Sequence, residues 1–227
     1  MAKEKKSEAI TSEKFRVQGR GSFLRLDKPR PYEEGAVPRW EATTMLDPAD
    51  AKGLESIKLI LKVSADIAKQ KWGVVPRAIK VLASQFIPGQ AAPGADVKDD
   101  KIELAFYSGT DKAETNPESY ESYKGLFIVP AHEYEDRAKP AIASRKGVSV
   151  SPGDDQWPYS GCYILTSLTA WTYEGRGKRR IGLNLRGVQF VKDGEPFGGG
   201  GEHSAEEEFD ALEDDEAAAA GGMDWDD

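Results

Sequence analysis

Hydrophobic and polar residues alternate along several stretches of the chain, with the two-residue period of β-strands that have one buried face. The first two such stretches are Phe15–Leu26 and Trp40–Leu46. The segment 28–35 between them is expected to be a loop, because its prolines cannot donate hydrogen bonds to a neighbouring strand. Further strands are predicted at Ile102–Tyr107, Gly125–Val129, Val148–Val150, Cys162–Tyr173 and Ile181–Val191.

One stretch follows the period of an α-helix instead. Apolar residues recur at three- and four-residue spacing between Leu54 and Ala68, which gives the helix one apolar face. Asp47 is expected to cap the helix, and Pro48 suits the first helical position because it has no N–H to leave unpaired. Gly73 is the expected stop at the other end. The pattern predicts a single core-packing helix, inserted after the second strand.

The two longest predicted strands are joined by the glycine-containing segment Glu174–Lys178, which favours an antiparallel hairpin. Gly187 interrupts the second of these strands and is expected to mark a β-bulge. Many short strands with one helix favour a small β-barrel or a sandwich, and closure of a barrel would remove exposed strand edges.

The acidic residues are concentrated at the C-terminal end. The chain has 227 residues, with 39 Asp and Glu against 31 Lys and Arg. Residues 202–227 hold 12 of the acids and no Lys or Arg, so residues 1–201 carry 27 acids and a charge of about +4. Such asymmetry is typical of proteins with nucleic-acid or other charged partners, although acidic tails also aid solubility. We expect a disordered segment at 1–13, one domain at 14–197, and a glycine hinge with a disordered acidic tail at 198–227.

Sequence motifs of the common enzyme classes are absent. The chain has no P-loop, GxGxxG, HExxH, CxxC or GxSxG motif. Acidic pairs such as Asp154 and Asp155 lie beside Gly and Pro, which is more typical of turns than of a two-metal nuclease. One cysteine and two histidines provide few ligands for a metal site. No apolar stretch approaches the ~20 residues of a membrane span. We expect a non-enzymatic protein without metal, cofactor or membrane contact.

Aromatic and basic residues gather around the predicted hairpin. One face of the strand Cys162–Tyr173 carries aromatic residues, while the other face is small or apolar and suits a core. Unpaired bases stack on aromatic rings and Lys or Arg contact the phosphates, so the aromatic face is a candidate surface for single-stranded DNA. The alternative is that these aromatic residues fill the core. The candidate stacking residues are Tyr163, Trp171, Tyr173, Phe106, Tyr107 and Tyr123, and the candidate phosphate-binding residues are Arg176, Lys178, Arg179, Arg180 and Lys124.

The acidic tail contains a few apolar residues among its carboxylates, namely Phe209, Leu212 and Trp225. This combination is typical of docking peptides, in which charge steers the encounter and an aromatic ring enters a pocket. A flexible glycine hinge would let the tail return to a cationic groove or reach another protein.

Three segments resemble a family of bacteriophage single-stranded-DNA-binding proteins, similar to podophage replication proteins with acidic tails. They are Tyr159–Tyr163, Gly182–Glu195 and Tyr123–Phe127. The resemblance implies a mainly β fold, an OB-fold-like antiparallel β-barrel with one inserted α-helix. It also implies binding of single-stranded DNA without sequence specificity, in replication, recombination and repair in the cytoplasm of the infected bacterial host. The tail is then expected to restrain DNA binding and to recruit phage replication proteins such as a polymerase, helicase or primase.

Two other functions are compatible with the sequence. An acidic adaptor or DNA mimic would bind protein partners only, and a nuclease would use dispersed carboxylates. Deletion of 202–227 distinguishes an adaptor from a DNA-binding protein. A DNA-binding protein should bind DNA more tightly without its tail, whereas an adaptor should lose its activity. The sequence is compatible with a monomer and with a homodimer that exchanges tails.

Overall fold

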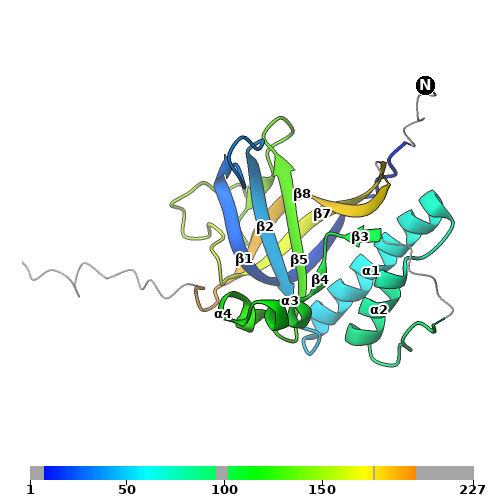
Figure 1. Cartoon of the computed structure of the whole chain (residues 1–227). Helices are drawn as coiled ribbons and strands as arrows, with labels where there is room; N and C mark the ends of the chain where they lie inside the picture. Colours follow the sequence, from blue (N-terminus) through cyan, green and yellow to red (C-terminus); the bar gives the residue numbers. More distant parts are fainter. Residues whose placement is uncertain (1–7, 96–101, 176, 198–227) are drawn as a thin grey trace, which may run out of the picture. The chain divides into compact units, whose positions relative to one another are not determined.

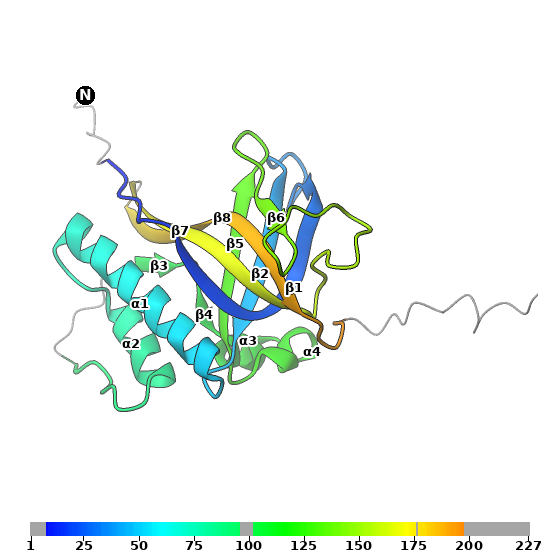
Figure 2. The same ribbon diagram turned by 180° about the vertical axis from the view of Figure 1, so that it is seen from behind.

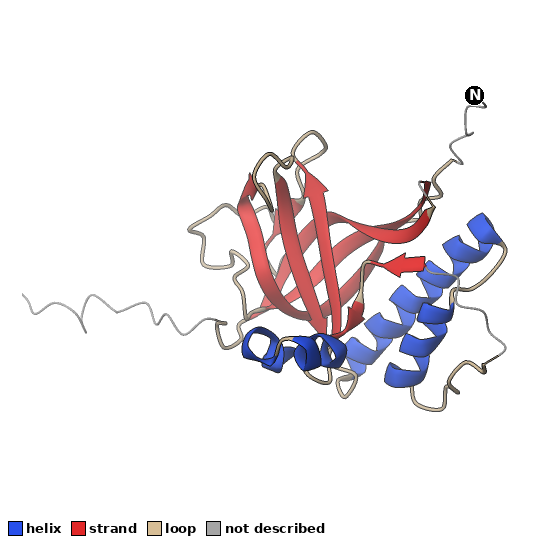
Figure 3. Ribbon diagram, in the orientation of Figure 1, coloured by secondary structure: helices blue, strands red, loops and turns tan. Residues whose placement is uncertain are grey.

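Strands dominate the structure, a computed structural model that describes residues 8–95, 102–175 and 177–197 (Figures 1 and 3). The described residues up to Pro196 belong to one structural unit. The predicted disordered tail lies outside the described residues, as do positions 1–7. Residues 10–12, which the sequence assigns to a disordered segment, form backbone hydrogen bonds with residues 170 and 172.

The described strands form one sheet that closes into a ring (Figures 1 and 2). They are β1 (Phe15–Arg30), β2 (Arg39–Leu46), β3 (Ile102–Leu104), β4 (Tyr107–Ser108), β5 (Phe127–Tyr134), β6 (Ala141–Ala143), β7 (Tyr163–Gly175) and β8 (Lys178–Lys192). Their order is β3-β8-β7-β1-β2-β5-β4, and β8 also pairs with β5 at His132 and Asn184. This last pairing closes the ring.

The prediction of a single helix and a purely antiparallel sheet is wrong, because the fold is mixed α/β. The helices are α1 (Ala51–Trp72), α2 (Arg77–Phe86), α3 (Gly109–Thr115), α4 (Pro117–Tyr120) and the 3-10 turn η1 (Glu121–Tyr123). The additional helices are only one to three turns long, too short for the periodic pattern that identifies a helix in a sequence. Strands β3, β5 and β6 pair with β8 in parallel, a long-range arrangement that local patterns do not reveal.

Helix α1 ends where the sequence predicts but begins three residues later. The Gly53 amide donates a 2.8 Å hydrogen bond to the Asp50 side chain, which caps the helix. Asp47 instead accepts from the Ala49 amide in the preceding turn. Gly73 ends the helix with a φ of 74°, a conformation that glycine adopts without steric cost.

The predicted hairpin and bulge are confirmed. Strands β7 and β8 pair antiparallel along their length, and the pairing shifts between Ser167, opposite Gly187, and Leu168, opposite Leu185. Strand β1 is longer than predicted and runs to Arg30. The predicted strand Val148–Val150 forms only an isolated bridge within the described part of the chain.

The core fills the interior of the ring and the space beneath α1, which packs against β1 and β7. Figures 1 and 2 show α1 and α2 side by side at one end of the sheet, and α3 and α4 beneath β2 and β5. None of the helices in the described ranges is both long and apolar enough to cross a membrane.

Candidate nucleic-acid interface

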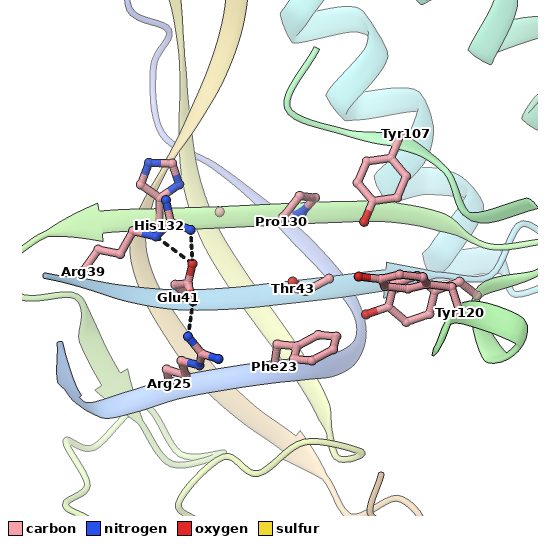
Figure 4. Close-up of a pocket in the computed structure, with 11 residues that line it drawn as sticks. Phe23, Arg25, Arg39, Glu41, Thr43, Tyr107, Tyr120, Pro130 and His132 are labelled. Carbon is pink, nitrogen blue, oxygen red and sulfur yellow. Dashed lines mark hydrogen bonds and ion pairs between the residues drawn. The ribbon is translucent and has the colours of Figure 1, made fainter. Parts of the chain in front are cut away.

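A groove of about 250 Å³ lies on the outward face of β1, β2 and β5 (Figure 4). We call it the tyrosine groove; its lining residues are Phe23, Arg25, Arg39, Glu41, Thr43, Tyr107, Tyr120, Tyr123, Pro130, Ala131 and His132. On β2, Glu41 and Thr43 point into the groove because they alternate with the buried Trp40 and Ala42. Figure 4 shows the tyrosines at one end and the arginines at the other.

The aromatic end is built from β4, α4 and η1. Tyr123 is buried, and its hydroxyl oxygen lies 3.2 Å from the Ser22 hydroxyl oxygen on β1. Its ring meets that of Tyr120 with centroids 5.4 Å apart. Burial raises the pKa of Tyr107 to about 12 and also raises the pKa of Tyr123, so both hydroxyls stay protonated at neutral pH. The half-buried rings of Tyr107 and Tyr120 are surfaces on which a base can stack.

Phe23 holds an unusual position at the edge of this groove. Its backbone φ is 48°, in the left-handed region that a bulky residue adopts only at a cost in energy. The pairing of β1 with β2 is irregular here, between Ser22 and Arg25, and Phe23 is 54% exposed. A strained backbone that presents an aromatic ring to solvent is a common mark of a binding site.

The polar end of the groove is organised by Glu41. Its carboxylate lies 3.1 Å from Arg25 Nη1 and accepts a 2.7 Å hydrogen bond from Arg39 Nε. The Arg39 guanidinium also lies over the Tyr32 ring, 4.7 Å from its centroid. The polar end thus presents two cations that share one carboxylate.

His132 lies in the groove and pairs with Asn184 of β8. Burial, followed by the charge of Arg39, lowers the pKa of His132 to about 4. Arg180 and Arg137 lower this pKa further, whereas Glu41 opposes the shift. The imidazole is therefore neutral at pH 7.

The predicted aromatic face of β7 points outward. Tyr163, Trp171 and Tyr173 are partly or largely exposed, while the alternate residues from Cys162 to Thr172 are buried. Tyr173 is 43% exposed. The Trp171 ring lies so close to the β8 backbone that a Cβ at position 182 would be 2.3 Å from it. The Tyr163 ring lies beneath the Lys192 ammonium, 4.3 Å away.

The predicted basic residues of the hairpin differ in their surroundings. Arg179 Nε donates a 2.9 Å hydrogen bond to Glu174, and its guanidinium lies 5.7 Å from the centre of the Trp72 ring. Lys178 pairs with Glu103 at 3.4 Å. Arg180 is exposed, and no other described residue forms an ion pair with it. Arg176 lies outside the described residues.

The other described binding residues predicted from the sequence do not line the tyrosine groove. Phe106 is 1% exposed and stacks on Phe127 in the core, with centroids 5.6 Å apart, so neither face of its ring is free. Lys124 is exposed and pairs with Glu121 at 3.4 Å. The tail residues Phe209, Leu212 and Trp225 lie outside the described residues.

The structure therefore brings Tyr107 and Tyr123 together, along with residues that the sequence did not single out. These are Phe23, Tyr120, Arg25, Arg39 and His132. The sequence does contain a weak signal for Arg39, because charged residues alternate with apolar ones on β2. Within the described ranges, no group of three His, Cys, Asp or Glu residues is arranged to hold a metal ion.

Comparisons with known proteins identify the family of this chain and a similar fold. Residues 12–219 match a family model described as the ssDNA-binding protein of Enterobacter phage Enc34. The putative protein p50 of Acyrthosiphon pisum secondary endosymbiont phage 1 is 37% identical over 93 residues, 41% of this chain. The match spans 47% of the length of that curated relative, about half of it.

Solved structures from two bacteriophages are among those similar to this chain. The single-stranded DNA-binding protein from bacteriophage Enc34, in complex with ssDNA, matches with a TM-score of 0.54 and 22% identity, over 87% of this chain and 97% of that chain. The gp2.5 single-stranded DNA binding protein of bacteriophage T7 matches with a TM-score of 0.49 and 12% identity, over 84% and 98% of the two chains. The likeness to the Enc34 structure shows a shared fold.

Proposed function

The chain belongs to the family of the Enterobacter phage Enc34 ssDNA-binding protein, and on this premise we propose that it binds single-stranded DNA through the tyrosine groove. The observation that carries the proposal is the combination of half-buried tyrosines and arginines on one outward surface. Rings offer stacking faces to unpaired bases, and guanidinium groups contact the phosphates between them.

The groove favours binding without sequence specificity. Its aromatic end offers ring faces, and every base has a face that can stack on them. A duplex hides these faces within its own stack, so the groove selects single strands. We also assign the ring of strands to the OB-fold class, in which such a face binds single strands.

The DNA path continues from the groove toward the β7–β8 hairpin. His132 in the groove pairs with Asn184 of β8, and the same strand carries Arg180 opposite Tyr173 in the hairpin, so β8 joins the two surfaces. We assign Arg180 and Lys178 to phosphate contacts, and Tyr173 to stacking. Trp171 and Tyr163, which pack against Gly182 and Lys192, form the edge of this surface.

The biological role follows from this activity and from the acidic segment. We place the protein in phage DNA replication, recombination and repair, in the cytoplasm of the infected bacterial host. Residues 202–227 carry 12 acids, and they would restrain DNA binding by competing with phosphates and would recruit replication proteins.

The test compares binding of a fluorescently labelled oligo-dT with binding of a duplex of equal length, measured by anisotropy at several salt concentrations. The protein should bind the single strand far more tightly, with a log-log salt slope of about −0.7 for each phosphate neutralised. A variant that ends at residue 201 should bind more tightly than the full chain. No binding by either form would contradict the proposal and favour a protein adaptor.

A further inference from the structure

One carboxylate in the tyrosine groove interacts with two arginines at once. Glu41 Oε2 lies 3.1 Å from Arg25 Nη1, while Oε1 accepts from Arg39 Nε at 2.7 Å. The Glu41 side chain is only 20% exposed, and so is that of Arg39. Figure 4 shows Glu41 between the two arginines; Glu41 shares β2 with Arg39, and Arg25 comes from the neighbouring β1.

A carboxylate and a phosphate are the same kind of partner for a guanidinium group. Both accept charge-assisted hydrogen bonds from its fork of N–H donors. Building on the proposed function, we propose that Arg25 and Arg39 form a site for one phosphodiester group of single-stranded DNA, and that the Glu41 carboxylate occupies this site in the free protein.

DNA and Glu41 cannot use the same donors together. A phosphate bonded to both guanidinium groups would lie within a few ångströms of the carboxylate. Two like charges at that separation in a partly desolvated groove repel strongly. The bound phosphate therefore displaces the Glu41 side chain toward solvent.

The carboxylate also explains how two arginines remain together without DNA. Their guanidinium groups would repel each other across the groove, and Glu41 offsets this repulsion. The two arginines are thus held together before DNA binds, but the Glu41 carboxylate then competes with the phosphate for them. DNA binding is therefore weaker and less dependent on salt with Glu41 present than it would be with the two arginines alone.

The experiment measures oligo-dT binding by the full chain over a range of salt concentrations, for wild type and Glu41→Gln. Glu55→Gln is the matched control, because Glu55 is an exposed partner of Lys52 on α1, outside the groove. Removing the competing carboxylate should tighten binding at low salt by up to about fivefold, the size of a partly exposed ion pair. The salt slope should steepen, because no freed carboxylate takes up a counterion when DNA binds, whereas Glu55→Gln should leave the slope unchanged.

A second comparison tests whether the effect runs through the arginines. In an Arg25→Gln, Arg39→Gln background, adding Glu41→Gln should no longer tighten binding. If Glu41→Gln does not fold, as judged by thermal unfolding, Glu41→Asp withdraws the carboxylate from at least one arginine and should tighten binding by a smaller factor. Weaker binding by a folded Glu41 variant would overturn the inference and leave the proposed function standing. A wild-type protein that does not bind oligo-dT would overturn both.

Discussion

The hydroxyl oxygens of Ser22 and Tyr123 lie 3.2 Å apart, although 101 positions separate the two residues in the sequence. This hydrogen bond joins η1 to β1, beside the irregular pairing that exposes Phe23. Because the Tyr123 ring in turn contacts Tyr120, the bond holds the aromatic end of the tyrosine groove in place. In the proposed interface, Tyr123 is thus a positioning residue, and we assign the stacking surfaces to Tyr107, Tyr120 and Phe23.

Replacing Tyr123 by phenylalanine should separate stability from DNA binding. The change leaves the buried Ser22 hydroxyl without its partner, which should lower the free energy of unfolding by about 1–3 kcal/mol. Oligo-dT affinity should stay within about twofold, since the ring that supports Tyr120 remains. Urea unfolding and anisotropy measure the two quantities. A large loss of affinity at unchanged stability would instead mean that the hydroxyl contacts DNA.

Phe23→Gly should weaken DNA binding with little effect on stability. Glycine adopts a φ of 48° freely, which relieves strain of about 1–2 kcal/mol, while its greater freedom in the unfolded chain costs roughly 0.5–1 kcal/mol. The lost ring should reduce affinity by one stacking contribution, about 1–3 kcal/mol. Calorimetry and anisotropy test this pair of outcomes. A variant that is clearly destabilised and still binds fully would assign Phe23 to packing.

Arg180→Gln and Arg179→Gln form a matched pair of adjacent charge changes. Arg180→Gln should weaken oligo-dT binding and make the salt slope shallower by about 0.7, because this cation is exposed and forms no ion pair with another described residue. Arg179→Gln should lower stability more than affinity, since Arg179 bonds Glu174 and covers Trp72. The reverse result, with Arg179 dominating the salt slope, would redirect the DNA path toward α1.

His132 should make stability depend on pH. Its pKa is about 4 in the folded protein and 6.5 as a model value, so the unfolded chain binds the proton more readily between these values. The contribution is fully present above about pH 6.5 and is lost as the pH falls toward 4. His132→Gln should therefore lose less stability than wild type over this window, in urea titrations at each pH. Parallel pH profiles would show that His132 does not titrate in this way.

Much of the fold follows from local sequence patterns. Alternation located the long strands, and the glycine-containing segment after Tyr173 identified the hairpin. The position of Gly187 identified the bulge. The match over residues 12–219 confirms the resemblance to a phage ssDNA-binding family, and with it the prediction of a non-enzymatic protein.

The groove could not be predicted in this way because it depends on contacts between distant elements. Strands β1, β2 and β5, with the segment from β4 to η1, supply its residues. Which cations are free also depends on pairing: Arg179 and Arg180 are neighbours in the hairpin, yet only Arg179 meets Glu174 and Trp72. The left-handed backbone of Phe23 has no signal in a single sequence, since phenylalanine rarely adopts it.

The most direct test of the account is photocrosslinking of the full chain to an oligonucleotide that carries 5-iodouracil, followed by mapping of the modified peptides. We expect adducts at Phe23, Tyr107 and Tyr120, because a stacked base lies against these rings, and few adducts with the matching duplex. Adducts confined to β7 and β8, with none in the tyrosine groove, would contradict the account.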